Sequence, residues 1–295
     1  MAGIIGSEIT PTIGVVFIKE HWAKKAQLAA RKAQVLAGTV FTDYDQEMSS
    51  GRILHIAHVL NLSVVTKDDN TVVVPNANTP TNQDITVSRY VYTAYNVQSV
   101  TDVQNEYDLI ELYGSQIGYA LQGDVETQLA GLPDGLSTNT VGTFGIEMTM
   151  DDWENAWQKL QVGLAPLGQR YAWLSSAAMS ALRKLGTPIS ADFTSSNKNA
   201  LDDATMGQFL GFTLIESQYL ESPSTGQHDC GVQHRDQYIL IRQKMPTIER
   251  ERIVGDLSTL TVGWELFVTA TREIVTEAAG SESLNDSWGV WLKTV

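Results

Sequence analysis

One short segment brings together side chains that commonly bind metal ions. It contains two histidines, an aspartate and the only cysteine of the chain, which are His228, Asp229, Cys230 and His234. Structural zinc sites use two closely spaced pairs of cysteine or histidine ligands. The spacing here matches no zinc pattern, and no second ligand pair stands elsewhere in the sequence. We therefore interpret the segment as a surface loop and predict no metal site.

Other ionisable residues also lack a catalytic arrangement. His55 and His58 fall on opposite faces of a predicted strand and cannot easily share a metal ion. Ser195–Lys198 fits the pattern Ser-x-x-Lys, which is too short to be informative in a serine-rich loop. Three acidic residues of a predicted long helix are more typical of a solvated face than of acid/base pairs: Glu111, Asp124 and Glu126.

The motifs of the common enzyme classes are missing. The sequence contains no Walker-type loop, dinucleotide fingerprint, nucleophile elbow or HExxH motif. Their absence does not exclude catalysis, but it favours a protein that is not an enzyme. We accordingly predict no catalytic residues and no cofactor.

The composition is that of a folded protein with unevenly placed charge. The chain has 295 residues, of which 43% are hydrophobic, and a formal charge of -14, which argues against nucleic-acid binding over its whole surface. Residues 1–40 carry five basic and two acidic groups, a net charge of +3, which leaves -17 for the remainder. The single cysteine excludes an internal disulfide framework. No targeting signal or membrane-length apolar run appears, so synthesis in the cytoplasm is expected.

A long amphipathic helix is predicted over Thr101–Leu132. Thr101 with Gln104 is typical of a capping box, and Gly131 with Pro133 supplies a stop. At the helical rise per residue such a helix would be roughly 40 Å long and would need a sheet to lie on. Its apolar residues recur every three or four positions and line one side: Val103, Tyr107, Ile110, Tyr113, Ile117, Leu121, Val125 and Leu129.

The regions before this helix differ in character. A helix is predicted over Phe17–Leu36 and ended by Gly38; its apolar side is mostly alanine, so it would need a partner surface. Arg52–Tyr95 is rich in β-branched and aromatic residues, and Lys67–Asn70 is typical of a hairpin tip. We interpret this second region as a long two-stranded excursion that is too polar at its tip to fold alone.

The region after the helix predicts a compact α/β unit and a return strand. The predicted elements are a helix over Asp151–Leu164 capped by Thr149, a strand over Tyr171–Leu174, a helix over Ser175–Leu185 ended by Gly186 and Pro188, and strands over Phe209–Ser217 and Gln237–Gln243. Leu257–Val275 alternates over its first half and is expected to add a strand to the sheet under the long helix. Residues 288–295 suggest one more strand.

This order of features resembles the Hong Kong 97-type major capsid protein of tailed bacteriophages. The resemblance covers nearly the whole chain and includes the patterns GQFLGFTLIES at residues 207–217 and TVGWELFVTATREI at residues 261–274. It implies an α+β fold with five regions. These are an N-arm at 1–40, an E-loop at 41–95, a P-domain with a spine helix at 96–148, an A-domain at 149–250, and return strands of the P-domain at 251–295.

The resemblance also implies a function, partners and a location. The chain would self-assemble through pentamers and hexamers into the icosahedral head shell that encloses double-stranded DNA. A portal protein, a separate scaffolding protein and in some shells a decoration protein would be its other partners, with no membrane. A separate scaffold is expected because the N-arm begins almost at Met1. The protein would be made in the cytoplasm of the host bacterium and end in the virion.

Residues that would contact neighbouring subunits follow from the implied regions. The basic N-arm is expected to hold a neighbour or scaffold first, and the exposed E-loop strands are expected to lie over the P-domain of a neighbour. In some relatives an E-loop lysine forms an isopeptide bond; for Lys67 an ordinary solvated turn is the favoured interpretation. The candidate contacts are Trp22, Lys24, Lys25, Arg31, Lys32, Lys67, Asp68, Asp69 and Arg89.

Two other classes of protein remain open on the sequence. An encapsulin-like shell of a cellular compartment would share the fold, although such proteins tend to have a shorter N-terminal helix. A soluble hydrolase or monomeric binding protein would have to explain the polar hairpin and the detached arm. Closed shells or capsomer rings would separate both shell proteins from a monomer.

Overall fold

The computed structural model describes residues 32–58, 64–75, 81–104, 109–185, 207–220, 228–278, 281–285 and 288–294. Most of the helix predicted over Phe17–Leu36 lies outside these ranges, and the described part, residues 32–36, is not helical. Gly38 belongs to a short 3-10 helix, Ala37–Thr39, and does not end an α-helix. The described chain combines α-helices and β-sheets, in agreement with the predicted mixed class.

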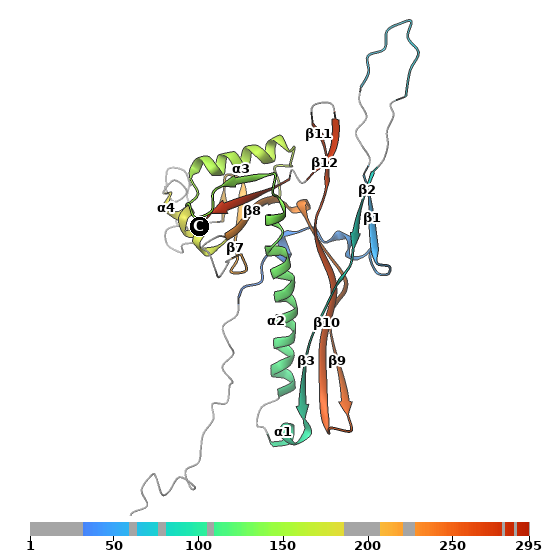
Figure 1. The fold of residues 1–295 in the computed structure, drawn as a ribbon, viewed down its shortest axis with the longest axis vertical. Helices are drawn as coiled ribbons and strands as arrows, with labels where there is room; N and C mark the ends of the chain where they lie inside the picture. Colours follow the sequence, from blue (N-terminus) through green and yellow to red (C-terminus); the bar gives the residue numbers. More distant parts are fainter. Residues whose placement is uncertain are drawn as a thin grey trace, which may run out of the picture. The chain divides into compact units, whose positions relative to one another are not determined.

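A three-stranded antiparallel sheet carries, on one face, the longest helix of the described residues (Figure 1). Its strand order is β3 (Arg89–Gln98), β10 (Ser258–Thr271), β9 (Tyr238–Ile253). Helix α2 (Leu109–Ala130) packs against β3 and β10. A Cβ at Gly263 of β10 would lie 2.0 Å from Ile117 Cγ2, so only glycine permits this close approach of helix and sheet. The predicted strand under the long helix is therefore confirmed.

The long helix is only partly as predicted. The structure has two helices in this range, α1 (Ser99–Gln104) and α2, and residues 105–108 between them lie outside the described part. Thr101 lies inside α1, so the predicted capping box is wrong. The stop is confirmed, because α2 ends at Ala130 and a 3-10 turn follows at Pro133–Gly135. The predicted apolar stripe is buried at Ile117, Leu121, Val125 and Leu129.

A six-stranded mixed sheet forms the second part of the fold. Its order is β4 (Thr140–Gly142), β13 (Gly289–Thr294), β8 (His228–His234), β5 (Arg170–Leu174), β7 (Phe212–Glu216), β6 (Gln208–Phe209). Helix α3 (Met150–Val162) packs on β13 and β4, and α4 (Ser176–Lys184) follows β5. Thr149 and Asp152 form a capping box at the start of α3, which confirms the predicted cap. Trp153, Ala156 and Leu160 form its buried side.

Three expectations for this region need correction. The predicted strand at 209–217 is a tight hairpin, because Leu210 and Gly211 both have positive φ and reverse the chain between β6 and β7. Residues 228–234 form the central strand β8, whereas we expected a surface loop. The further strand predicted at 288–295 is confirmed as β13, but it pairs with β8 and β4 rather than in the sheet under α2.

Two further strand pairs complete the fold. β1 (Ile53–His58) pairs with β2 (Thr81–Thr86), and β11 (Ile274–Ala278) pairs with β12 (Ser281–Asn285). The β1–β2 pair is tied to the body because its side chains share a hydrophobic cluster with Ile239 and Ile241 of β9. A second cluster joins both sheets, since it contains Val125 of α2, Trp173 of β5 and Phe267 of β10.

Candidate inter-subunit surfaces

The excursion between β1 and β2 ends in an open hairpin, defined here as residues 64–75 (Figure 1, top right). The predicted turn at Lys67–Asn70 is confirmed: the Thr71 N–H donates to the Asp68 carbonyl at 3.1 Å, and the Thr71 hydroxyl donates to the same oxygen at 2.8 Å. On either side of the turn, residues 64–68 and 71–75 are not assigned to a β-ladder. The β-strands that we predicted for these residues are therefore not formed.

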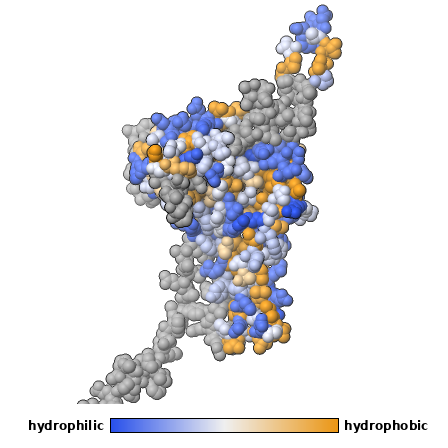
Figure 2. Space-filling model, viewed as in Figure 1, coloured by the Kyte–Doolittle hydropathy of each residue, from blue (hydrophilic) through white to orange (hydrophobic). Residues whose placement is uncertain are grey.

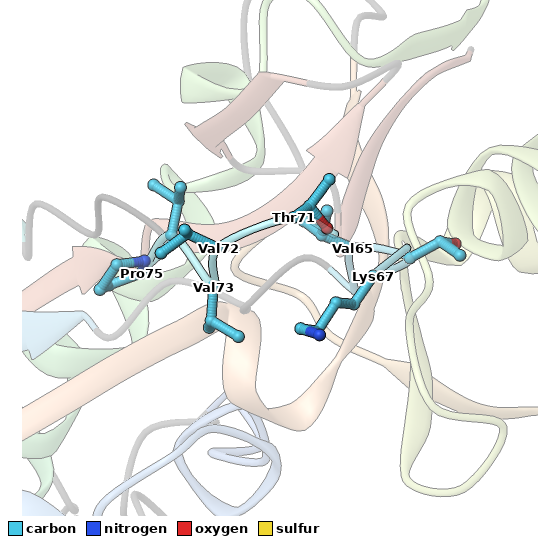
Figure 3. Close-up of a pocket in the computed structure, with 8 residues that line it drawn as sticks. Val65, Lys67, Thr71, Val72, Val73 and Pro75 are labelled. Carbon is cyan, nitrogen blue, oxygen red and sulfur yellow. The ribbon is translucent and has the colours of Figure 1, made fainter. Parts of the chain in front are cut away.

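The open hairpin exposes an unusual density of valines. A hollow of about 550 Å³ lies between the two flanks of this hairpin. Figure 3 shows Val65 and Lys67 on one flank and Val72, Val73 and Pro75 on the other. Val64 is 99% exposed and Val72 is 86% exposed. Figure 2 shows hydrophobic and hydrophilic residues together at this tip. Large exposed apolar side chains gathered at one place are typical of an interaction surface.

A second apolar surface lies on the face of the three-stranded sheet that is turned away from α2. Tyr90, Tyr92 and Trp264 form this aromatic band: Trp264 is directly opposite Tyr92 in the ladder, and its ring centroid lies 5.6 Å from that of Tyr90. The alternating residues Gly263 and Glu265 are buried on the α2 side, so the band faces outward. Both tyrosines are exposed.

Charged groups border the aromatic band. Lys244 places its ammonium group 5.8 Å from the centroid of the Trp264 ring. The Trp264 indole N–H donates to Glu249 at 3.1 Å. An aromatic centre with polar groups at its edge has the composition of a protein–protein contact.

The predicted contact residues fall into three groups. Trp22, Lys24, Lys25 and Arg31 lie outside the described residues. Lys67, Asp68 and Asp69 are exposed on the open hairpin. The other two, Lys32 and Arg89, are engaged within the chain, so their contact with a neighbour stays a prediction.

Arg89 forms a two-pronged ion pair with Asp124 of α2. Its Nε lies 2.7 Å from Asp124 Oδ2 and its Nη2 lies 2.6 Å from Oδ1. The hydrogen bonds to this carboxylate raise the pKa of Arg89. The solvated face that we expected at Asp124 is therefore a structural contact between α2 and β3.

Sequence reasoning missed an anchor at residues 32–37. Glu126 is fully buried and accepts hydrogen bonds from the backbone N–H groups of Val35, Leu36 and Ala37 at 3.2, 2.9 and 3.1 Å. The interpretation of Glu126 as a solvated residue is therefore wrong. The available signal was its place beside Val125 on the flank of the apolar stripe, which a helical projection would show.

Lys32 extends this anchor toward the six-stranded sheet. Its backbone N–H donates to the Tyr119 hydroxyl at 2.8 Å, and its ammonium group donates to the Gln218 carbonyl at 3.1 Å. The same ammonium group lies 5.0 Å from the centroid of the Tyr219 ring. Burial, together with its hydrogen bond to Tyr119, raises the pKa of Tyr219 to about 12, so this hydroxyl is protonated at neutral pH.

A buried ion pair lies between α2 and the sheet. Glu265 of β10 is fully buried, and its Oε1 lies 3.1 Å from Arg242 Nε. Burial raises the pKa of Glu265 despite the opposing effect of Arg242. Arg242 also donates to Gln122 of α2 at 2.7 Å, and its backbone N–H donates to Asp45 at 2.8 Å. These contacts fix the helix, the sheet and the segment before β1 together.

The structure describes the side chains of two members of the histidine and cysteine cluster, Cys230 and His234. Cys230 and His234 are buried in β8, and burial lowers the pKa of His234. Among the described residues, no group of three or more histidines, cysteines or acidic residues is placed to bind a metal ion. His55 instead pairs with Asp84 across the β1–β2 ladder at 2.5 Å. Ser195–Lys198 lies outside the described residues.

Solved structures match the chain over almost its whole length. A chain from Mycobacterium phage Che8 is 21% identical, with a TM-score of 0.75 and a match covering 94% of this chain and 97% of that one. The capsid structure of cyanophage P-SCSP1u matches at 18% identity and a TM-score of 0.74, covering 96% and 94%. The mature capsid of bacteriophage PhiM1 matches at 11% identity and a TM-score of 0.71, covering 94% and 92%.

These matches define the class to which the structure belongs. No protein-family model and no curated protein sequence matches the chain. At identities this low, the structural likeness establishes the fold, which is that of phage capsid proteins. The expected resemblance is confirmed at this level. Within the described residues, no helix is both long and apolar enough to span a membrane.

Proposed function

We propose that this chain is the major capsid protein of a tailed bacteriophage. In this proposal it self-assembles through pentamers and hexamers into an icosahedral head shell around double-stranded DNA and has a structural rather than an enzymatic role. The observation that carries the proposal is a capsid fold that extends over nearly the whole chain. The proposed location is the virion, after synthesis in the cytoplasm of a host bacterium.

The Hong Kong 97-type layout assigns a role to each region. Residues 1–40 would be the N-arm and 41–95 the E-loop, which contains the open hairpin. Residues 96–148 and 251–295 would form the P-domain, with α2 as the spine helix, and 149–250 the A-domain. These boundaries are approximate in three places. β4 and β13 pair in the six-stranded sheet of the proposed A-domain, and β9 pairs with β10 in the sheet under α2.

The open hairpin and the aromatic band would be the two halves of one contact between copies. An exposed apolar hairpin is a liability in a monomer but becomes a contact when it covers a neighbouring subunit. The exposed tyrosines of the aromatic band offer a surface of matching character. Contacts of this head-to-tail kind close into rings when the rotation between copies allows it.

The hairpin contact is tested by paired substitutions at Val72. Val72→Asp places a charge on the apolar flank, whereas Val72→Ile keeps it apolar, and neither should disturb folding because the residue is exposed. Sedimentation velocity should show that Val72→Ile assembles as the unmodified chain does and that Val72→Asp stays as small species. Equal assembly of both variants would contradict the role given to the hairpin.

The N-arm is tested by deleting residues 1–31. The deletion leaves the Glu126 anchor in place, so the body should fold as before. We propose that the arm, with Trp22, Lys24, Lys25 and Arg31, first holds a neighbouring subunit or a scaffolding protein. Shell formation that is unchanged by the deletion would contradict this role. The portal protein, a decoration protein and the packaged DNA are the remaining proposed partners.

The contents of assembled particles separate the viral proposal from an encapsulin-like compartment. Particles isolated from producing cells should contain double-stranded DNA, or a scaffolding protein before packaging. An enzyme cargo in their place would favour the compartment. Both outcomes would keep the shell-forming role.

A further inference from the structure

The last residue of α3 and the loop that follows it present a group of aliphatic side chains to solvent. Val162, Leu164 and Leu167 are 76%, 66% and 69% exposed. They fall within residues 162–167, called the apolar loop below. This loop belongs to the six-stranded sheet and its helices, and it is distinct from the open hairpin and the aromatic band.

A partly buried tryptophan and a buried arginine hold the backbone of the apolar loop. The Trp288 indole N–H donates to the Gly163 carbonyl at 2.8 Å. Arg170 is only 2% exposed and donates to the carbonyls of Pro166 at 2.7 Å and Ala165 at 2.5 Å. A buried guanidinium group is costly, and burial lowers the pKa of Arg170. Arg170 therefore fixes this loop although burying its guanidinium group costs free energy.

The C-terminal motif of α3 also fixes the backbone of the apolar loop. Leu164 has φ 58°, in the left-handed region that residues other than glycine and asparagine avoid. Ala165 is buried and its N–H donates to the Leu160 carbonyl at 3.0 Å, so Leu164 is held outward between two tied neighbours. Leu164 is the first residue beyond the C-cap of α3, and its N–H donates to the Gln161 carbonyl at 3.0 Å, so its left-handed backbone belongs to a Schellman motif that ends the helix. This helix end directs the apolar side chain of Leu164 into solvent.

The charge of the chain indicates which partner would cover this loop. Residues 161–169, QVGLAPLGQ, contain no charged side chain, although the whole chain carries -14. Two copies of one acidic protein repel each other, so their contacts are favoured where the surface is uncharged. An exclusively aliphatic patch is also typical of permanent contacts between identical subunits. A basic or nucleic-acid partner would find no group to pair with.

We infer that the apolar loop is a contact between two copies of this chain in the assembled shell. The inference rests on the proposed function and adds a surface to it. Three side chains are too few to form a stable interface alone, because specific interfaces bury about 800 Å² on each partner. The apolar loop is thus one of several contacts that each subunit makes, and it contributes rigidity because its backbone is already fixed.

The test compares the reactivity of an introduced thiol before and after assembly. Leu164→Cys is labelled with a maleimide in the dissociated chain and in shells formed from the purified chain alone. Asn155→Cys, on the exposed side of α3, is the matched control, and the native Cys230 is fully buried. Assembly should slow the labelling of Leu164→Cys at least tenfold more than that of Asn155→Cys. Equal slowing at the two positions would overturn the inference.

A second variant tests the energetic role. Leu164→Asn tolerates the left-handed backbone and removes the apolar side chain, so folding should be preserved. The concentration needed for assembly should rise roughly tenfold, the effect of losing one buried leucine. An unchanged concentration would contradict the inference.

The outcomes distinguish this inference from the proposed function. Shells that form while Leu164→Cys stays fully reactive would overturn the apolar loop contact and keep the capsid function. Protection that appears only when another virion protein is added to shells that have already formed would overturn the second copy as the occupant. An unmodified chain that forms no assembly under any condition would overturn both.

Discussion

The Oε2 atom of Glu126 lies 2.9 Å from the backbone nitrogen of Leu36, and the same carboxylate also accepts hydrogen bonds from the N–H groups of Val35 and Ala37. A fully buried acid of α2 therefore fixes the segment that leads from residues 1–31 into the body. Three backbone donors satisfy a charge that would otherwise be too costly to bury.

Glu126→Gln should weaken this anchor. The glutamine amide keeps one acceptor oxygen, but its NH2 group would face the backbone N–H groups, which are also donors. The free energy of unfolding should therefore fall by about 1–3 kcal/mol. Denaturant unfolding measures the loss, and hydrogen exchange should show faster exchange of the amides of residues 35–37. Glu154→Gln, an exposed change on α3, is the matched control and should have little effect. Unaltered protection of these three amides would contradict the anchor.

Gly263→Ala should separate α2 from the sheet. Its Cβ would lie 2.0 Å from Ile117 Cγ2, so the helix or the side chain must shift, at a cost of about 1–3 kcal/mol. Thermal unfolding measures the change. Gly118→Ala on α2 has no atom within 4 Å of the new Cβ and should instead stabilise the helix by about 0.5–1 kcal/mol. Destabilisation by both variants alike would argue against the close approach.

The raised pKa of Glu265 makes the free energy of unfolding depend on pH in a defined direction. Burial raises the pKa of Glu265 above the ordinary value of 4.5, while Arg242 lowers it less and Asp124 raises it further. The folded state thus binds this proton more tightly than the unfolded state does. Stability from this group is full below pH 4.5 and is lost as pH rises through the folded pKa.

Glu265→Gln removes this titration and provides the measurement. The unmodified chain should lose stability relative to the variant as pH rises from about the unfolded pKa, and the difference should level off above the folded pKa. Denaturant unfolding at several pH values gives the curve. A difference that is independent of pH, or one that favours the unmodified chain as pH rises, would contradict the raised pKa.

Local sequence patterns predicted the helices and strands in which buried residues recur at a regular spacing. The stripe from Ile117 to Leu129 faces the sheet because it repeats at 3.6 residues, and Thr149 caps α3 through a contact three residues away. The alternation in residues 258–271 likewise predicted β10. Each of these signals lies within a few residues of its effect.

Features that depend on distant partners could not be predicted in this way. β8 is buried because it lies between β13 and β5, although its sequence HDCGVQH has no strand-like alternation. In the sequence, Glu126 and Asp124 cannot be distinguished from acidic residues of a surface. Their roles depend on residues 35–37 and Arg89, which are distant in the sequence. The reversal at Leu210 requires a left-handed leucine, which no turn preference indicates.

Electron microscopy of the purified chain at high concentration, paired with sedimentation velocity, tests the central claim most directly. The account predicts closed shells or rings of five and six subunits, formed by the chain alone or after co-expression with neighbouring genes that supply a scaffold. A monodisperse monomer under all of these conditions would contradict the assignment of this fold to shell assembly.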